Sequence, residues 1–188
     1  MERTSDAELM ARVKAGDQDA FAQVIDRYKD GIVNFLSRLT GSLAQAQDLA
    51  QETFLRLYYK REGYTEAGKL SGYLYRIATN LARSEHRRDA RRRILTLAFL
   101  HGNNGSQAPS TPQTHLLKNE IRHNLKKAIE KVPLRYRVPL LLHTVEGLTY
   151  NEVAEVLGCR EGTVKSRISR GRACLKSRMA AFLQEDES

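Results

Sequence analysis

The segment from Leu148 to Arg167 constrains the fold more than any other part of the chain, because it joins two helical patterns by a tight turn. Thr149 followed by Glu152 has the spacing of a capping box, which predicts a defined start for the first helix. Gly158 can adopt the left-handed conformation that ends a helix. Beyond it, apolar residues recur at helical spacing and predict a second helix with one buried face: Val164, Ile168 and Leu175. The segment therefore predicts a helix-turn-helix.

The second helix of this motif carries cations and hydrogen-bond donors on its other faces. They are Lys165, Ser166, Arg167, Ser169, Arg170 and Arg172. A helix that is held by a short turn and exposes such groups has the shape that enters the major groove of DNA. A helical hairpin with a solvated basic face is the alternative. The agreement between periodicity, caps and turn favours the DNA-binding motif.

Charge and composition are consistent with a nucleic-acid partner. The 188 residues carry a formal net charge of +9, and the length suits one or two small domains. No apolar run is long enough to cross a bilayer and the N-terminus lacks a signal-peptide core, so we expect a cytoplasmic protein without membrane insertion. The two cysteines, Cys159 and Cys174, cannot cross-link a fold of this size, and no Cys/His cluster has zinc-ligand spacing. We therefore expect neither a metal nor a cofactor.

The pattern of apolar residues predicts an all-α fold of two small helical domains. Nearly every segment has helical spacing, and nothing alternates as a sheet does. Apolar stripes in residues 21–39, 49–58 and 70–81 predict three long helices that can bury a shared core. We expect this first domain to comprise residues 1–95.

A change of composition separates the two domains. Residues 101–114 are polar, contain glycine and proline and cannot build a core, so we expect residues 96–115 to form a flexible linker. Before them, residues 94–100 form an apolar patch that is expected to dock on the domain or on a partner. Helical spacing resumes afterwards, and residues 116–188 are expected to form a second domain that contains the helix-turn-helix.

The third long helix of the first domain is expected to have a cationic face opposite its apolar stripe. Spacings of four, three and four residues place these side chains on one side: Arg76, Asn80, Arg83 and Arg87. They are flanked by Ser84, His86 and Arg88. Arginines at this density suit phosphate contacts, which position DNA without reading its sequence. Asn80 could bond a base edge, and Tyr73 or Tyr75 could stack on an unpaired base, although core packing is favoured for Tyr73.

The preceding helix combines carboxylates with apolar side chains that we expect to be exposed. Its residues of interest are Asp48, Gln51, Glu52, Phe54, Leu55 and Tyr58. Such a face suits docking against a helix of a protein partner. Two carboxylates four residues apart can also indicate a metal or an acid–base pair, but nothing nearby supplies further ligands or a nucleophile. We therefore do not expect an enzyme.

Three of these segments together resemble a known family. Residues 48–58 are similar to the core-polymerase-binding helix of bacterial sigma factors, residues 72–82 to their promoter-melting helix, and residues 158–172 to the helix that reads the minus-35 element. Many regulators share a helix-turn-helix, but the three motifs in this order and spacing are specific. The two domains and short linker resemble the extracytoplasmic-function group.

The resemblance implies an alternative sigma factor that binds RNA polymerase core, directs it to promoter DNA and helps to open the duplex. It implies that the residues meeting the polymerase are Asp48, Gln51, Glu52, Phe54, Leu55 and Tyr58. Those holding the melted minus-10 strand would be Tyr73, Arg76, Asn80, Arg83, Ser84, Arg87 and Arg88. Those facing the minus-35 duplex would be Arg160, Thr163, Lys165, Ser166, Arg167, Ser169 and Arg170. Whether an anti-sigma factor restrains the chain is left open.

Two positions depart from the family pattern. Tyr73 stands where the family usually has tryptophan, so an aromatic ring for stacking is retained. Arg160 and Glu161 stand where a proline commonly begins the second helix of the motif. An acid there pairs well with the helix dipole but would repel a phosphate.

Two other classes of function compete with this interpretation. A DNA-binding repressor or activator that works without polymerase would usually dimerise on a palindrome, and it would not need the acidic–apolar helix at residues 48–58. A recombinase or nuclease would need a nucleophile or a metal cluster, and the sequence offers neither.

Overall fold

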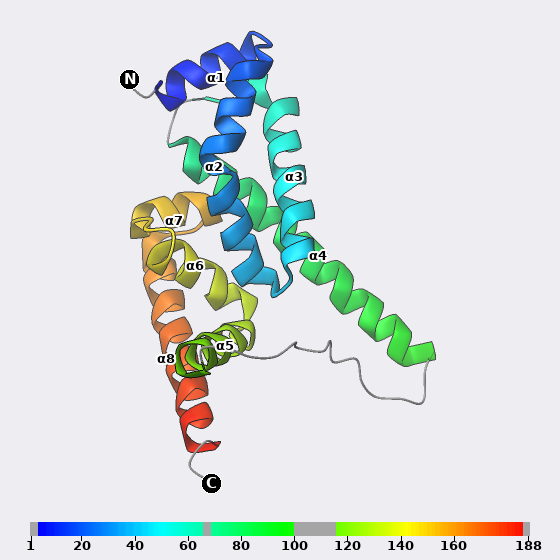
Figure 1. The fold of residues 1–188 in the computed structure, drawn as a ribbon, viewed down its shortest axis with the longest axis vertical. Helices are drawn as coiled ribbons and strands as arrows, with labels where there is room; N and C mark the ends of the chain where they lie inside the picture. The colour runs from blue at the N-terminus through cyan, green and yellow to red at the C-terminus, as the bar shows by residue number, and fades with distance from the viewer. Residues whose placement is uncertain (1–3, 66–68, 100–115, 186–188) are drawn as a thin grey trace.

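The computed structural model describes residues 4–65, 69–99 and 116–185, with side chains described for 4–65, 69–92 and 123–180. These parts of the chain form helices and no strands, which confirms the all-α prediction (Figure 1). The helices of the first half are α1 (Asp6–Lys14), α2 (Gln18–Thr40), α3 (Leu43–Tyr59), the short 3-10 helix η1 (Arg61–Gly63) and α4 (Leu70–Phe99). Those of the second half are α5 (Leu116–Glu130), α6 (Leu134–Thr144), α7 (Tyr150–Leu157) and α8 (Glu161–Glu185).

Local signals in the sequence set the ends of the helix-turn-helix, which consists of α7 and α8. The Thr149 hydroxyl accepts from the backbone N–H of Glu152, whose carboxylate accepts from the Thr149 N–H at 2.8 Å, so the predicted capping box is confirmed. Gly158 has φ +62 and ends α7 in the left-handed conformation, as predicted. These caps define where α7 begins and where it ends, directly before the turn that leads to α8.

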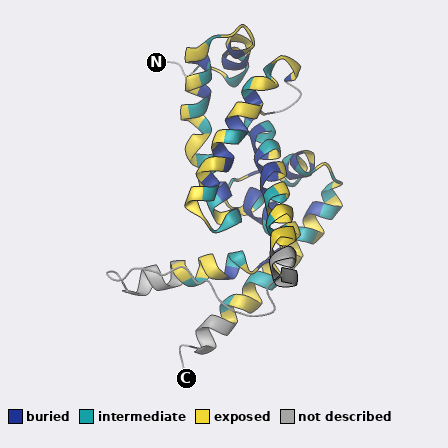
Figure 2. Cartoon of the chain, turned by 90° about the vertical axis from the view of Figure 1, so that its right-hand side faces the viewer, coloured by how far each residue is buried: buried dark blue, intermediate teal, exposed yellow. Residues whose placement is uncertain are grey.

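The first half is a bundle of α1 to α4 around an apolar core. Its fully buried side chains include Leu9, Ile32, Phe35, Leu36, Leu57, Leu70 and Leu74. The predicted stripes of α2, α3 and α4 therefore meet one another. Figure 2 shows buried residues gathered where the helices pack and exposed residues on their outer faces.

The second half packs α6, α7 and α8 around Leu141, Leu142, Val164 and Ile168. At Gly171 a Cβ atom would lie 3.2 Å from the backbone carbonyl oxygen of Tyr136, which is a tight contact, so glycine there favours the close approach of α8 to α6. The predicted apolar face of the second helix is therefore confirmed for Val164 and Ile168, whereas Leu175 is only half-buried.

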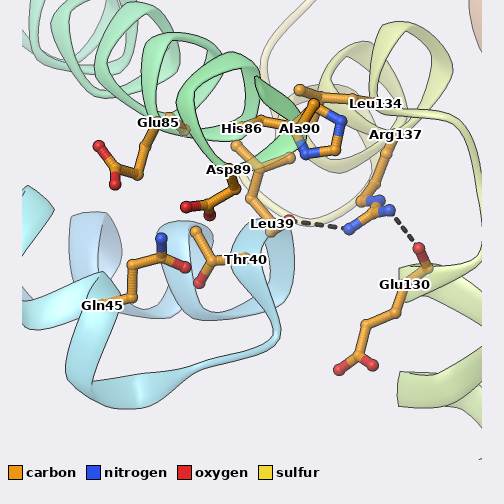
Figure 3. A pocket seen from close by; sticks show the side chains of 11 residues that line it. Leu39, Thr40, Gln45, Glu85, His86, Asp89, Ala90, Glu130, Leu134 and Arg137 are labelled. Carbon is orange, nitrogen blue, oxygen red and sulfur yellow. Dashed lines mark hydrogen bonds between the residues drawn. The ribbon is translucent and has the colours of Figure 1, made fainter. Parts of the chain in front are cut away.

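The two halves also pack against each other, although their composition suggested two domains on a flexible tether. One apolar cluster runs through both of them. Arg137 of α6 donates 2.8 Å to the Leu39 carbonyl at the end of α2, and also donates to the carbonyls of Val132 and Glu130. Beside this contact lies a cavity of about 540 Å³ between α4 and the second half, with Arg137 reaching across its wall (Figure 3).

The helix α4 continues beyond the expected first domain. It reaches Phe99, which lies inside the 96–115 segment expected to be the linker, and its second half projects from the other helices (Figure 1). The polar segment at 101–114 and the side chains of the apolar patch at 94–100 lie outside the described residues.

Candidate polymerase and promoter interfaces

One face of α4 carries most of the residues predicted to hold the minus-10 strand. The residues that share it are Tyr73, Arg76, Asn80, Arg83, Ser84 and Arg87. Arg76, Asn80 and Arg87 are exposed, whereas Arg83 is half-buried. Arg88 is exposed, pairs with Glu85 at 3.1 Å and lines a small hollow together with Ser84 and Arg87. Helical spacing thus produces a single cationic strip, with Arg88 beside its C-terminal end.

The two tyrosines considered for base stacking have different surroundings. Tyr75 is 8% exposed, and its ring packs edge-on against Phe35 at 5.3 Å. The expectation that it could stack on a base is therefore wrong, because it faces the core. Tyr73 is half-buried, lies edge-on to Tyr64 with ring centroids 5.2 Å apart, and lines a small cavity with Arg76.

The helix-turn-helix lies across this same face of α4. Lys69, which precedes α4, forms an ion pair of 2.8 Å with Glu152 of α7. At Gly72 a Cβ atom would lie 4.0 Å from Cγ2 of Val156. Between them is a cavity of about 280 Å³, to which Glu155 of α7 also contributes. The first helix of the motif therefore covers the N-terminal part of the predicted strand-binding strip.

Further along α4, a cationic cleft of about 680 Å³ separates the strip from the turn of the motif. The described residues that line it include no acid: Asn80, Arg83, Ser84, His86, Arg87, Leu134, Arg135, Leu157, Gly158, Cys159 and Arg167. Burial and then the charge of Arg167 lower the pKa of Arg83. Two guanidinium groups therefore face each other in a partly dehydrated space, which favours an anion between them.

The residues predicted to face the minus-35 duplex occupy the outer surface of α8 and the turn before it. Arg160, Lys165, Ser166, Ser169 and Arg170 are exposed. The remaining two, Thr163 and Arg167, are half-buried, and Arg167 lines the cleft beside α4. The structure therefore brings this set together on one broad surface.

Several of these groups already have partners on the protein. The ammonium of Lys165 lies 2.6 Å from Glu161 one turn earlier, and this hydrogen bond raises the pKa of Lys165. Ser166 donates to the carbonyl of Thr163 at 2.9 Å. A hydrogen bond from Arg170 lowers the pKa of Tyr136 on α6. The departure from the family pattern at Glu161 thus neutralises one of the cations predicted to meet DNA.

The acidic–apolar face of α3 is only partly as predicted. Asp48 and Gln51 are exposed and Leu55 is 41% exposed. Glu52 pairs with Arg56 at 2.7 Å. Phe54, however, is 6% exposed and points into the bundle, so its predicted place on an exposed apolar surface is wrong.

The end of α3 carries two neighbouring tyrosines, of which Tyr58 was predicted as a site residue and Tyr59 was not. Tyr58 is half-buried, with its ring 5.0 Å from that of Phe21 and the guanidinium of Arg61 over it at 4.3 Å. Tyr59 is 76% exposed and follows Leu55 by four residues, so both lie on one side of the helix. The four-residue spacing from Leu55 is the sequence signal that could have identified Tyr59 as part of this surface.

Comparison with known proteins decides the family. A family model described as Sigma-70 region 2 matches residues 24–93, and one described as Sigma-70, region 4 matches residues 122–175. The ECF RNA polymerase sigma factor SigW of Bacillus subtilis is 35% identical over 175 residues, which cover 89% of this chain and 93% of that protein. The chain belongs to the extracytoplasmic-function sigma factors of the sigma-70 family. The RNA polymerase sigma-H factor of Pseudomonas aeruginosa is 30% identical over 186 residues, or 96% of each chain.

Solved structures support the same fold for this sigma factor. The protein CnrH, determined in complex with the cytosolic domain of CnrY, has a TM-score of 0.69 at 21% identity, and the match covers 92% of this chain and 96% of CnrH. The sigma factor RpoE of Bartonella quintana, in complex with the anti-sigma factor NepR, has a TM-score of 0.66 at 24% identity. The match covers 85% of this chain and 96% of RpoE.

The family establishes the function in outline. The protein is an alternative sigma factor that binds RNA polymerase core and directs transcription initiation at promoter DNA. Members of this family are initiation factors rather than enzymes. None of the described helices is long and apolar enough to cross a membrane.

Proposed function

We propose that residues 1–95 bind polymerase core and the minus-10 element, that residues 96–115 connect the domains, and that residues 116–188 read the minus-35 element. The match of region 2 to residues 24–93 and of region 4 to residues 122–175 supports this division. The protein acts where polymerase and chromosome meet, in the cytoplasm.

The cationic strip of α4 holds the melted minus-10 strand, and this is the assignment that carries the proposal. Arg76, Arg83 and Arg87 supply positive charge along one face, and Asn80 presents both a donor and an acceptor between them. Phosphates are attracted to the arginines, while an amide can recognise an unpaired base. Tyr73 offers a half-buried aromatic ring at the N-terminal end of the strip.

The surface of α8 reads the minus-35 duplex. Ser166, Ser169 and Arg170 lie opposite the buried Val164 and Ile168, so they can face a major groove while the helix stays packed. Lys165 contributes after it separates from Glu161. Arg160, just before α8, and Thr163, in its first turn, are assigned to contacts with the DNA backbone.

The exposed strip of α3 binds the polymerase. Asp48, Gln51, Leu55 and Tyr59 follow one another at helical spacing and are all exposed, which supports a helix-docking surface. Phe54 supports this surface from inside the bundle, and Glu52 and Tyr58 lie at its edges.

A protein partner of the anti-sigma class fits the same domains. CnrH and RpoE of Bartonella quintana share this fold and are bound to the cytosolic domain of CnrY and to NepR, respectively. We extend that kind of partner to this chain as part of the proposal.

The decisive experiment combines the chain with core polymerase and maps transcript starts across genomic DNA. New starts that share sequences at both elements are the expected result. A chain that binds duplex DNA specifically without core, or that adds no starts to core, contradicts the proposal. Changes in Arg76 or Asn80 should then act on opening, and changes in Arg170 should alter promoter choice.

A further inference from the structure

The cationic cleft of about 680 Å³ between α4 and the turn of the helix-turn-helix has the charge and shape of a small-molecule site. We propose that it binds a compact polyphosphate, a run of three or more adjacent phosphoryl groups that is either free or carried by a nucleotide. The charges of such a ligand are adjacent, whereas those of a DNA strand are spread along its backbone. The site depends on the cleft alone, and only its effect on promoter binding rests on the proposed function.

Four guanidinium groups converge on this one space from three helices: Arg83, Arg87, Arg135 and Arg167. The first two belong to α4, the third to α6 and the last to α8. Within the part of the chain that the structure describes, no ion pair joins any of them to a carboxylate. Because like charges repel, this arrangement favours an anion that several guanidinium groups hold at once.

Arg135 distinguishes this site from the DNA interfaces. It is exposed at the start of α6 and has no part in the proposed strand or duplex contacts. Its guanidinium lies over the ring of Tyr136, 4.7 Å from the centroid. A strand that follows α4 has no need of Arg135, whereas a ligand seated in the cleft can contact it together with Arg83 and Arg167.

The beginning of α6 adds positive potential to the same cleft. The residue before this helix is Pro133, which supplies no side-chain cap. Leu134 and Arg135, in the first turn, line the cleft. The start of a helix carries partial positive charge and backbone N–H groups, both of which favour phosphate. This terminus therefore reinforces the field of the four arginines.

The cleft also has room and chemistry for a nucleoside beside the phosphates. Its volume lies in the range of about 300–1,000 Å³ that small-molecule sites occupy. Leu134 and Leu157 supply apolar surface, and the amide of Asn80 supplies a donor and an acceptor for a base edge. An inorganic polyphosphate would use the arginines alone. The two sources therefore differ in what they gain from the leucines and the amide.

Cys159 lies inside the cleft and can report whether it is occupied. This cysteine is half-buried, and its Sγ is 4.0 Å from a guanidinium nitrogen of Arg167. Cys174 is also half-buried but does not line the cleft. The two thiols thus form a matched pair, of which only Cys159 should respond to a ligand in the cleft.

Binding is tested by calorimetric titration of the full chain with ATP, tripolyphosphate and AMP. ATP and tripolyphosphate should each fill one saturable site and bind at least about tenfold more tightly than AMP, because adjacent phosphates engage several guanidinium groups. Tighter binding of ATP than of tripolyphosphate assigns the site to a nucleotide, and equal binding assigns it to the phosphate chain. No saturable binding, or binding that sodium sulfate abolishes at equal ionic strength, would overturn the site.

Alkylation then locates the bound ligand. In a chain with Cys174→Ser, saturating tripolyphosphate should slow the reaction of Cys159 with iodoacetamide by about tenfold, since the ligand fills the space around the thiol. In a chain with Cys159→Ser, the reaction of Cys174 should not change. Mass spectrometry follows both reactions. Equal protection of the two cysteines, or protection of neither, places the ligand outside the cleft and contradicts the proposal.

Variants of the cleft separate a built site from general attraction to a basic protein. Arg135→Ala and Arg167→Ala should each weaken tripolyphosphate binding by about tenfold, because each removes a charge-assisted hydrogen bond. Arg172→Ala is the matched control, because this exposed arginine of α8 does not line the cleft. Its loss should weaken binding by less than about twofold. Equal losses for all three variants would show that only net charge matters.

A polyphosphate in the cleft should compete with promoter DNA, because Asn80, Arg83 and Arg167 belong both to the cleft and to the proposed DNA contacts. Tripolyphosphate at constant free Mg²⁺ should lower initiation at a mapped promoter by polymerase that carries this chain. Arg135→Ala should relieve the inhibition and leave initiation without polyphosphate unchanged. Equal inhibition of native and Arg135→Ala chains contradicts this competition.

The site and the proposed function fail in different measurements. Absence of binding in the titration overturns the polyphosphate site and leaves the assigned DNA contacts untouched. Binding and protection of Cys159 without any effect on initiation keep the site but contradict the use of the same side chains by DNA.

Discussion

The Tyr75 hydroxyl donates a hydrogen bond of 2.5 Å to Glu146, 71 residues further along the chain. Burial, followed by this hydrogen bond, raises the pKa of Tyr75, so the phenol remains a neutral donor at any physiological pH. The carboxylate that it meets is 9% exposed and belongs to the connection before the helix-turn-helix. A residue of α4, for which we propose a role in promoter melting, is therefore tied to the half of the chain for which we propose recognition of the minus-35 element.

Arg137 makes the second polar tie between the domains, and its loss should be costly. Arg137→Ala removes the hydrogen-bond donor to the carbonyl oxygens of Leu39 and Val132. Both oxygens then lose these partly buried hydrogen bonds. We expect the free energy of unfolding to fall by about 2–3 kcal/mol. Urea unfolding followed by circular dichroism measures it, with the exposed Arg135→Ala as control. Equal stability of the two variants contradicts the role of Arg137.

Core binding should depend on the exposed strip of α3. Leu55→Ala together with Tyr59→Ala should weaken binding to core polymerase by about 1–3 kcal/mol without unfolding the bundle. Phe54→Ala should instead lower the free energy of unfolding by about 3–5 kcal/mol, because it leaves a cavity. A fluorescence titration against core, paired with thermal unfolding, separates the two effects. Native core affinity in the Leu55/Tyr59 variant would place the contact elsewhere.

Duplex recognition should improve when Glu161 is neutralised. Glu161→Gln removes an acid from the start of α8 and releases Lys165 from its 2.6 Å ion pair. We expect tighter binding of the polymerase complex to promoter duplex and a salt dependence steeper by about one unit, since one more cation meets a phosphate. Lys165→Ala in the same background should abolish the gain. If the gain in affinity survives Lys165→Ala, it comes only from the loss of repulsion between Glu161 and the DNA phosphates.

Strand opening should depend on Asn80 more than on its charged neighbours. Asn80→Ala removes an amide from the α4 strip but keeps the positive field of Arg76, Arg83 and Arg87. Closed-complex binding should persist while permanganate reactivity of unpaired thymines falls. A promoter with a mismatched bubble should recover part of the lost transcription, because opening then no longer depends on base capture. Unchanged reactivity on a paired promoter would remove Asn80 from the mechanism.

Local signals in the sequence predicted the helices and the motif well, because caps and apolar periodicity act over a few residues. The Thr149–Glu152 box and the conformation of Gly158 are examples. Phe54 was misplaced because one residue of an apolar run can face either way until the neighbouring helices are in position.

The contact between the two domains could not be predicted in the same way. Lys69 and Glu152 are 83 positions apart, and a pair at such separation leaves no periodic trace in a single sequence. The polar segment between the domains suggested independent movement, and composition alone does not report whether the domains that it joins also pack.

Acid should loosen the domain contact through Glu152. A hydrogen bond from Lys69, followed by those from the backbone and side chain of Thr149, lowers the pKa of Glu152 from 4.5 to about 2. A carboxyl with a lowered pKa in the folded state stabilises the fold fully above pH 4.5 and loses that contribution as the pH falls toward about 2. The folded chain, with its two halves in contact, should therefore lose stability over this range.

Glu152→Gln isolates that contribution, because glutamine can keep the capping box but does not titrate. The free energy of unfolding of this variant should fall less steeply than that of the native chain between pH 4.5 and about 2. Glu8→Gln is the matched control: Glu8 forms the equivalent box with Ser5 in α1, and hydrogen bonds from Ser5 lower its pKa without a lysine from another domain. If both variants flatten the pH dependence equally, the effect belongs to the caps; a larger effect at Glu152 assigns the difference to Lys69 and to the contact between the domains.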